Sequence, residues 1–122
     1  MAKKHILLID DDMWMRELMA NVLQRHRYTV SHAANAIEGI ERIDEIRPDM
    51  IVLDLMMPGP NGIVLLHELQ SYSDTSAIPV VACTNSAAEL PLSMLAPYGV
   101  KRIIDKTTMN LGDIVTAARR YA

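Results

Sequence analysis

The chain has 122 residues, which is long enough for one domain with a hydrophobic core of its own. Half of the residues are hydrophobic, 22% are charged and the formal net charge is −3. This composition is typical of a globular protein and lacks the positive charge that favours binding to nucleic acid or to an anionic membrane. No apolar stretch is long enough for a membrane span or a signal peptide, so we expect a cytoplasmic protein. The single cysteine, Cys83, excludes an internal disulfide, and its apolar neighbours predict a packed thiol.

Short apolar runs alternate along the chain with segments in which apolar residues recur at helical spacing. The apolar runs predict strands at residues 6–9, 28–32, 50–53, 79–83 and 102–104. The helical spacing predicts helices at residues 13–26, 36–46, 63–70, 86–98 and 111–121. The fourth helix is the weakest prediction because two prolines, Pro91 and Pro97, interrupt it. This alternation predicts an α/β fold with a parallel sheet, helices on both faces and right-handed crossovers, in a single domain over residues 1–122.

Polar side chains follow four of the predicted strands at the points where these strands end. They are carboxylates after the first and third strands, a hydroxyl after the fourth and an ammonium after the fifth: Asp10, Asp11, Asp12, Asp54, Thr84 and Lys106. Because ligands of open α/β sheets bind beyond the carboxyl ends of the strands, we expect these groups to meet at one edge. Clustered carboxylates repel one another unless a cation compensates their charge, and Mg²⁺ is the natural cation for a site made of oxygen atoms.

The same residue types suit phosphoryl transfer. Mg²⁺ keeps several waters, one of which a phosphate oxygen can replace. Lys106 and Thr84 could contact other phosphate oxygens while a carboxylate attacks the phosphorus. The pattern therefore predicts a metal-assisted phosphate site, but it does not choose the acceptor among the aspartates.

Each of these residues also has an explanation without chemistry. An aspartate after the first strand could cap the following helix, which accounts for one of the three. Asp54 alone could be a turn residue, Lys106 alone a surface lysine and Thr84 alone a hydroxyl at a strand end. Their joint position at four strand ends favours the phosphate site.

With these residues in place, the sequence resembles the receiver domain of bacterial two-component response regulators, typified by the chemotaxis response regulator. The resemblance extends from His5 to Tyr121 and depends on residues 6–12, 48–62, 79–84 and 99–106, of which the second stretch is the most specific. It implies a doubly wound, flavodoxin-like fold of three layers, with five parallel strands in the order 2-1-3-4-5. It also implies a regulatory domain that assists its own phosphorylation and dephosphorylation but is not otherwise an enzyme. We expect no output domain within these residues.

The resemblance implies a role for each residue of the site. The magnesium ligands would be three carboxylates and one backbone carbonyl: Asp10, Asp11, Asp54 and Met56. Asp11 would bind the ion directly and Asp10 largely through coordinated water. Asp54 would be the phosphoacceptor, and Thr84 and Lys106 would contact its phosphoryl group. The donor would be a phosphohistidine on a sensor histidine kinase or a phosphotransfer protein, and the chain could act as a monomer or as a phosphorylation-dependent homodimer.

Four positions depart from the family pattern. Ile103 stands where an aromatic residue is usual, and Asn85 replaces a small residue and would crowd the path of the phosphate. Thr107 replaces a proline that usually follows a cis bond. Without proline the cis form costs about 3 kcal/mol, so we expect a trans bond and a different loop. Pro91 should break the fourth helix or delay its start.

These departures lie in the part of the fold that usually carries output, from the fourth to the fifth helix. They motivate an alternative, in which a degenerate receiver binds partners without being phosphorylated. A phosphohydrolase with an aspartate nucleophile, in the style of haloacid dehalogenase-like enzymes, is disfavoured. The chain is too short for the cap of those enzymes and lacks a threonine two residues after Asp12.

For Trp14 and for the methionines near the site, the sequence does not decide whether the side chains lie in the core or on the surface. Trp14 is the only tryptophan, and we favour packing over the first turn of its own helix above a role in a partner surface. Five of the nine methionines lie near the predicted site: Met13, Met15, Met19, Met56 and Met57. For most of them we favour core filling above an adaptable docking patch, since the chain has no phenylalanine.

Overall fold

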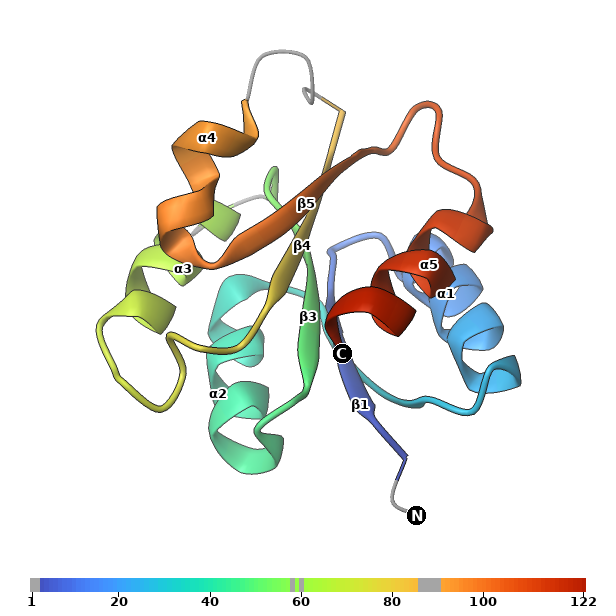
Figure 1. Cartoon of the computed structure of the whole chain (residues 1–122), viewed down its shortest axis with the longest axis horizontal. Coiled ribbons are helices and arrows are strands. Elements are labelled where there is room, and N and C mark those ends of the chain that lie inside the picture. The colour runs from blue at the N-terminus through green and yellow to red at the C-terminus, as the bar shows by residue number, and fades with distance from the viewer. Residues whose placement is uncertain (1–2, 58, 60, 86–90) are drawn as a thin grey trace.

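Strands and helices alternate along the chain in the computed structural model, which describes residues 3–57, 59, 61–85 and 91–122 (Figure 1). The strands are β1 (His5–Ile9), β2 (Thr29–Ala33), β3 (Met50–Asp54), β4 (Val80–Thr84) and β5 (Val100–Asp105). The helices are α1 (Met13–Arg25), α2 (Ala36–Ile46), α3 (Gly62–Gln70), α4 (Leu92–Leu95), the 3₁₀ helix η2 (Ala96–Tyr98) and α5 (Leu111–Tyr121). Within the described ranges, no helix is long and apolar enough to cross a membrane.

The strands form one sheet, in the order β2-β1-β3-β4-β5, and each pair of neighbours is parallel. Figure 1 shows α1 and α5 on one side of this sheet and α2, α3 and α4 on the other. The predicted three-layer fold and strand order are therefore confirmed. The carboxyl ends of β1, β3 and β4 lie side by side at one edge, as the site prediction requires.

Alternate residues of the strands face two separate apolar clusters, one on each side of the sheet. Ile6 and Leu8 of β1 pack with residues of α1 and α5, whereas Leu7 and Ile9 pack with residues of α2 and α3. Burial on both faces explains why the strand segments are continuous apolar runs. Cys83 belongs to the first cluster and is 1% exposed, and burial raises the pKa of its thiol to about 12. The prediction of a packed thiol is confirmed.

The starts of three helices are fixed by side chains that accept hydrogen bonds from the first turn. Asp12 caps α1 by accepting from the Met15 backbone N–H at 3.2 Å, and Asn35 and Asn61 cap α2 and α3 in the same way. Such caps satisfy backbone donors that have no partner within the helix. The cap accounts for Asp12, so Asp10 and Asp11 still need another explanation.

The helix α4 begins at Leu92, directly after Pro91, so this proline marks a helix boundary as predicted. Pro91 is the N-cap of α4, which has only four residues and continues into η2. Gly99 ends this segment in the left-handed region, with φ of 85°. Residues 86–90 of the predicted helix lie outside the described residues. β5 is longer than predicted because it starts at Val100 and includes the exposed Lys101, which interrupts the apolar pattern of this edge strand.

Trp14 is 70% exposed, so the prediction that it packs over its own helix is wrong. The reason is its position on α1. Leu23, which is fully buried, lies nine residues further on, and at about 3.6 residues per turn this places the two side chains on opposite sides of the helix. The methionines near the site differ in burial. Met19 and Met57 are buried, but Met13 and Met56 are each 62% exposed.

Gly62, the first residue of α3, lies against the backbone at the end of β3. A Cβ atom there would be 2.8 Å from the carbonyl oxygen of Asp54 and 2.8 Å from the Cα atom of Leu55. A side chain at Gly39 of α2 would also meet a neighbour at 2.8 Å, but that neighbour is the terminal methyl group of Ile9. Backbone cannot give way as a side-chain terminus can, so glycine is required more strictly at position 62.

We predict that Gly62→Ala lowers the free energy of unfolding by about 1–3 kcal/mol, because α3 must move away from β3. Gly39→Ala should change it by less than about 1 kcal/mol, since the gain in helix propensity offsets the shift of one methyl group. Urea denaturation of both variants and the wild type measures the difference. Equal stability of Gly62→Ala and the wild type would contradict the close approach at β3.

Candidate functional site

Four strand ends bring the predicted polar residues to the same edge of the sheet. Asp10 directly follows β1, and its backbone N–H donates to the carbonyl of Ala33 at 3.1 Å. Asp54 and Thr84 are the last residues of β3 and β4. Lys106 directly follows β5, and its backbone N–H donates to the Thr84 carbonyl at 3.0 Å. The positions of these side chains are therefore fixed by the sheet itself.

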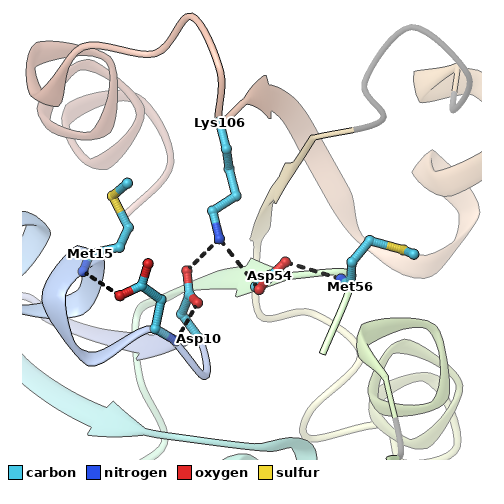
Figure 2. Close-up of polar contacts among 6 residues, drawn as sticks. Asp10, Met15, Asp54, Met56 and Lys106 are labelled. Carbon is cyan, nitrogen blue, oxygen red and sulfur yellow. Dashed lines mark hydrogen bonds and ion pairs between the residues drawn. The ribbon is translucent and has the colours of Figure 1, made fainter. Parts of the chain in front are cut away.

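The Lys106 ammonium lies between two buried carboxylates (Figure 2). Its Nζ atom is 2.9 Å from Asp10 Oδ2 and 3.4 Å from Asp54 Oδ2. Asp10 is 1% exposed and Asp54 is 4% exposed. Lys106 thus contacts two aspartates that lie 96 and 52 positions before it in the sequence.

The second oxygen of each buried carboxylate is held by a backbone N–H two residues further along. Asp10 Oδ1 accepts from Asp12 at 2.9 Å, and Asp54 Oδ1 accepts from Met56 at 3.0 Å. These bonds within the loops fix the orientation of both carboxylates, so that Oδ2 of each one points to Lys106. Figure 2 shows this arrangement around Asp54.

Burial makes the negative charge of Asp54 costly. Desolvation raises the pKa of Asp54 to about 6, and the charge of Asp10 acts in the same direction, against the lowering effects of the Met56 N–H and of Lys106. For Lys106, burial alone would lower the pKa, but the hydrogen bond and the charge of Asp10, together with Asp54, raise it on balance. The ammonium therefore stays protonated at neutral pH, yet it does not fully compensate the two carboxylates.

A third carboxylate completes a cluster that fits a divalent cation. One oxygen from each of Asp10, Asp11 and Asp54 lies within 4.8 Å of the others, and Asp11 is exposed. An all-oxygen donor set with two buried anions is the chemistry that Mg²⁺ selects, and the exposed side leaves room for the waters that this ion retains. The backbone carbonyl of Met56 as a fourth ligand stays a prediction.

The residues that depart from the family pattern have defined positions. Asn85 is exposed, directly after β4. Ile103 is partly buried and packs against the apolar cluster on the side of α2 and α3. The bond between Lys106 and Thr107 is trans, as expected, since the described residues contain no cis peptide.

Sequence reasoning missed Asp105, which shapes the loop after β5. Its Oδ1 atom accepts from the Thr107 backbone N–H at 2.8 Å and from the Thr107 hydroxyl at 2.6 Å. The hydroxyl and then the N–H of Thr107 lower the pKa of Asp105. The Asp105 carbonyl accepts from Met109 at 2.9 Å. The Asp-x-Thr pattern is typical of such a turn and could have indicated how Lys106 is held without a proline.

Comparisons with known proteins agree with this geometry. The family model of the response regulator receiver domain matches residues 6–119. The response regulator MprA of Mycobacterium ulcerans is 38% identical over 84 residues, which cover 69% of this chain and 36% of MprA. The chemotaxis protein CheY of Halobacterium salinarum is 26% identical over 120 residues, which cover 93% of this chain and 98% of CheY. The alignment thus spans about a third of MprA but nearly all of CheY.

Solved structures share the fold at lower identity. The chemotaxis response regulator CheY4 of Vibrio cholerae has a TM-score of 0.88 and 21% identity, over 99% of this chain and 100% of that chain. A response regulator described as putative, from Chloroflexus aurantiacus, has a TM-score of 0.88 and 21% identity, over 98% of each chain. At these identities the similarity supports the fold and not a particular activity.

The raised pKa of Asp54 predicts a pH-dependent cost to stability when no metal is present. The folded state binds the proton of Asp54 more tightly than the unfolded state, whose pKa is near 3.8, so stability falls as the pH rises from about 4 through 6. Asp54→Asn should therefore be more stable than the wild type at pH 8 by roughly 1–3 kcal/mol. This advantage should shrink towards pH 4.

Chemical denaturation in EDTA-containing buffer across this pH range measures the difference. Glu41→Gln is the matched control, because Glu41 is an exposed carboxylate on α2 and its removal should give no such trend. An advantage of Asp54→Asn that is the same at pH 4 and pH 8 would contradict the burial cost of the ionised carboxylate.

The carboxylate cluster also predicts that Mg²⁺ stabilises the folded chain. At ten times its dissociation constant the ion should add about 1.4 kcal/mol to the free energy of unfolding. Asp11→Asn should lose most of this gain. Asp12→Asn should keep it, because Asp12 caps α1 and asparagine is an equally good cap. Thermal unfolding with and without MgCl₂ measures the shift, and an undiminished shift in Asp11→Asn would count against the cluster as the binding site.

Proposed function

Since the chain belongs to the response regulator receiver domain family, we propose that it is a phosphorylation-dependent switch whose phosphoacceptor is Asp54. The observation that carries the proposal is the Lys106 ammonium, 2.9 Å from Asp10 and 3.4 Å from Asp54, beside a third carboxylate. Such a site can neutralise the charge of an incoming phosphoryl group and position it. These two effects account for most of the catalysis of phosphoryl transfer.

The contacts of the three carboxylates support Asp54 as the acceptor. Both oxygens of Asp10 are engaged, Oδ1 by the Asp12 N–H and Oδ2 by Lys106 at the shorter distance. Asp11 is exposed, in contrast to the two buried carboxylates. Asp54 is fixed through Oδ1, while its Oδ2 atom has the longer contact of 3.4 Å with Lys106. A nucleophile needs such an oxygen, which is oriented but only weakly neutralised.

The proposed step transfers a phosphoryl group from a phosphohistidine. Asp54 Oδ2 forms a bond to phosphorus as the phosphorus–nitrogen bond of the donor breaks, and the electron pair of that bond returns to the imidazole. The products are an acyl phosphate and a free histidine. The Lys106 ammonium would contact one phosphoryl oxygen and neutralise part of its charge, and the Thr84 hydroxyl would donate a hydrogen bond to another. Mg²⁺, held by Asp10, Asp11, Asp54 and the Met56 carbonyl, would supply further neutralisation of negative charge.

The donor in this proposal is a sensor histidine kinase or a phosphotransfer protein. The surface beside the site suits a protein donor. Trp14 is 70% exposed, and Met13 and Met56 are each 62% exposed. Met13 and Trp14 closely follow the aspartates that come after β1. Exposed aromatic and methionine side chains are typical anchors of protein interfaces.

A phosphorylation-independent interaction module is the second candidate. The observation that favours it is Ile103, which already packs against the core and so cannot move inward on phosphorylation as an aromatic residue could. The cluster of Asp10, Asp54 and Lys106 weighs against it, because a module that is never phosphorylated has no need to bury two carboxylates around one ammonium.

Incubation with acetyl phosphate, followed by intact-mass measurement, tests the proposal. We expect one phosphoryl adduct per chain that depends on Mg²⁺ and is labile in base. Asp54→Asn should give none, whereas the matched variant Asp12→Asn should be labelled like the wild type. The absence of an adduct under all conditions would favour the interaction module. Repeated release of phosphate from generic monoesters would instead indicate a hydrolase.

A further inference from the structure

A cavity of about 350 Å³ lies between α2, α3 and the loop that follows α3. Its lining comes from the second half of α2, from the end of α3 and from residues 72–75. Helices of a parallel α/β fold run opposite to the strands, so the ends of α2 and α3 lie at the edge of the sheet away from the aspartate cluster. The cavity is therefore separate from the phosphoacceptor site, and its volume is within the range of small-molecule sites.

The inner wall of the cavity is apolar and buried. Ile43 and Leu69 line it and are 1% and 3% exposed, and Ile40 packs against the same apolar cluster. The hydroxyl of Thr75, which is also buried, donates to the Leu69 carbonyl at 2.7 Å. The backbone N–H of Ser76 donates to the carbonyl of residue 72 at 2.9 Å. These bonds hold the loop against α3, so the cavity is already formed without a ligand.

The charged residues that line the cavity carry a net negative charge. Three are carboxylates and one is a guanidinium: Asp44, Glu68, Asp74 and Arg47. Arg47 Nη2 is 2.8 Å from Asp74 Oδ2, and Nη1 is 4.0 Å from Asp44 Oδ1, so its charge is already engaged. Glu68 is partly buried, and its side-chain carboxylate makes no hydrogen bond or ion pair with any described residue. One carboxylate at the cavity is thus left without a counter-charge.

We propose that this cavity binds a small organic cation, with an apolar body against Ile40 and Leu69 and an amidinium, guanidinium or ammonium group at Glu68. The ring of Tyr72 lines the same cavity and is 57% exposed, so it can supply a face for a cation. The excess of carboxylates repels phosphates and other anions, so a cation fits the cavity better than a nucleotide does. The proposal is independent of phosphoryl transfer, because none of its residues belongs to the cluster at Asp54.

Titration of the ¹⁵N-labelled chain with benzamidine, followed by ¹H–¹⁵N NMR spectra, tests the proposal. We expect saturable shifts confined to residues 40–47 and 68–75. Benzamide, which has the same shape but no charge, should bind at least threefold more weakly, and benzoate should give no saturable shifts. Glu68→Gln should weaken benzamidine binding roughly threefold or more, as for a partly exposed ion pair. Glu45→Gln is the matched control, because Glu45 is on α2 but does not line the cavity, and it should bind like the wild type.

Three results would each overturn the proposal. They are the absence of saturable shifts with benzamidine, equal affinity for benzamidine and benzoate, and unchanged affinity in a folded Glu68→Gln. The spectrum of Glu68→Gln itself shows whether the variant is folded. Asp54→Asn should bind benzamidine as the wild type does, so failure of phosphorylation and failure of cation binding are distinguishable.

Discussion

Two almost fully buried carboxylates, Asp10 and Asp54, share the charge of one ammonium, that of Lys106. Burying two like charges at neighbouring strand ends is costly, and the pKa of Asp54, raised to about 6 by burial, reflects this cost. Much of the surrounding structure maintains the arrangement. Backbone N–H groups orient both carboxylates, the turn at Asp105 fixes the loop after Lys106, and the absence of a side chain at Gly62 lets α3 begin directly against β3. The edge of the sheet therefore holds a site that is short of positive charge, and this is the property a phosphoacceptor with a divalent cation requires.

The two halves of the fold differ in how far they follow the family pattern. The half that contains β1 and β3 carries Asp10, Asp11 and Asp54, and none of the four departures from the family pattern lies in it. In the other half, α4 is a single turn that starts after Pro91, and Ile103 is already packed against the core. A signal from Asp54 would have to reach a partner without the inward movement of an aromatic side chain. The side chain of Lys106, which directly follows β5, contacts Asp10 after β1 and Asp54 at the end of β3, and so offers a direct physical connection between the two halves.

The sequence predicted the sheet well, and also the edge at which Asp10, Asp54 and Lys106 meet, because both depend on local patterns. Buried parallel strands are continuous apolar runs, and the polar residue that ends each run marks the ligand edge. The sequence predicted the bounds of β5 and the exposure of Trp14 less well, because the apolar pattern alone does not show which side of an edge strand or a helix faces solvent. Lys101 interrupts the apolar pattern of β5 because edge strands are half solvated, and Trp14 is exposed because the buried stripe of α1 lies on the other side of the helix. The cavity beside Glu68 could not be predicted at all, since it depends on how α2 packs against α3.

The identity of the acceptor is the central claim, and chemical mapping of the phosphorylated residue tests it most directly. Borohydride reduces an acyl phosphate of aspartate to homoserine, which peptide sequencing by mass spectrometry locates in the chain. After phosphorylation and reduction, homoserine should be found at position 54 alone. Homoserine at position 10 or 11 would contradict the assignment of roles within the cluster, and a phosphorylated chain that yields no homoserine at all would contradict an aspartyl phosphate.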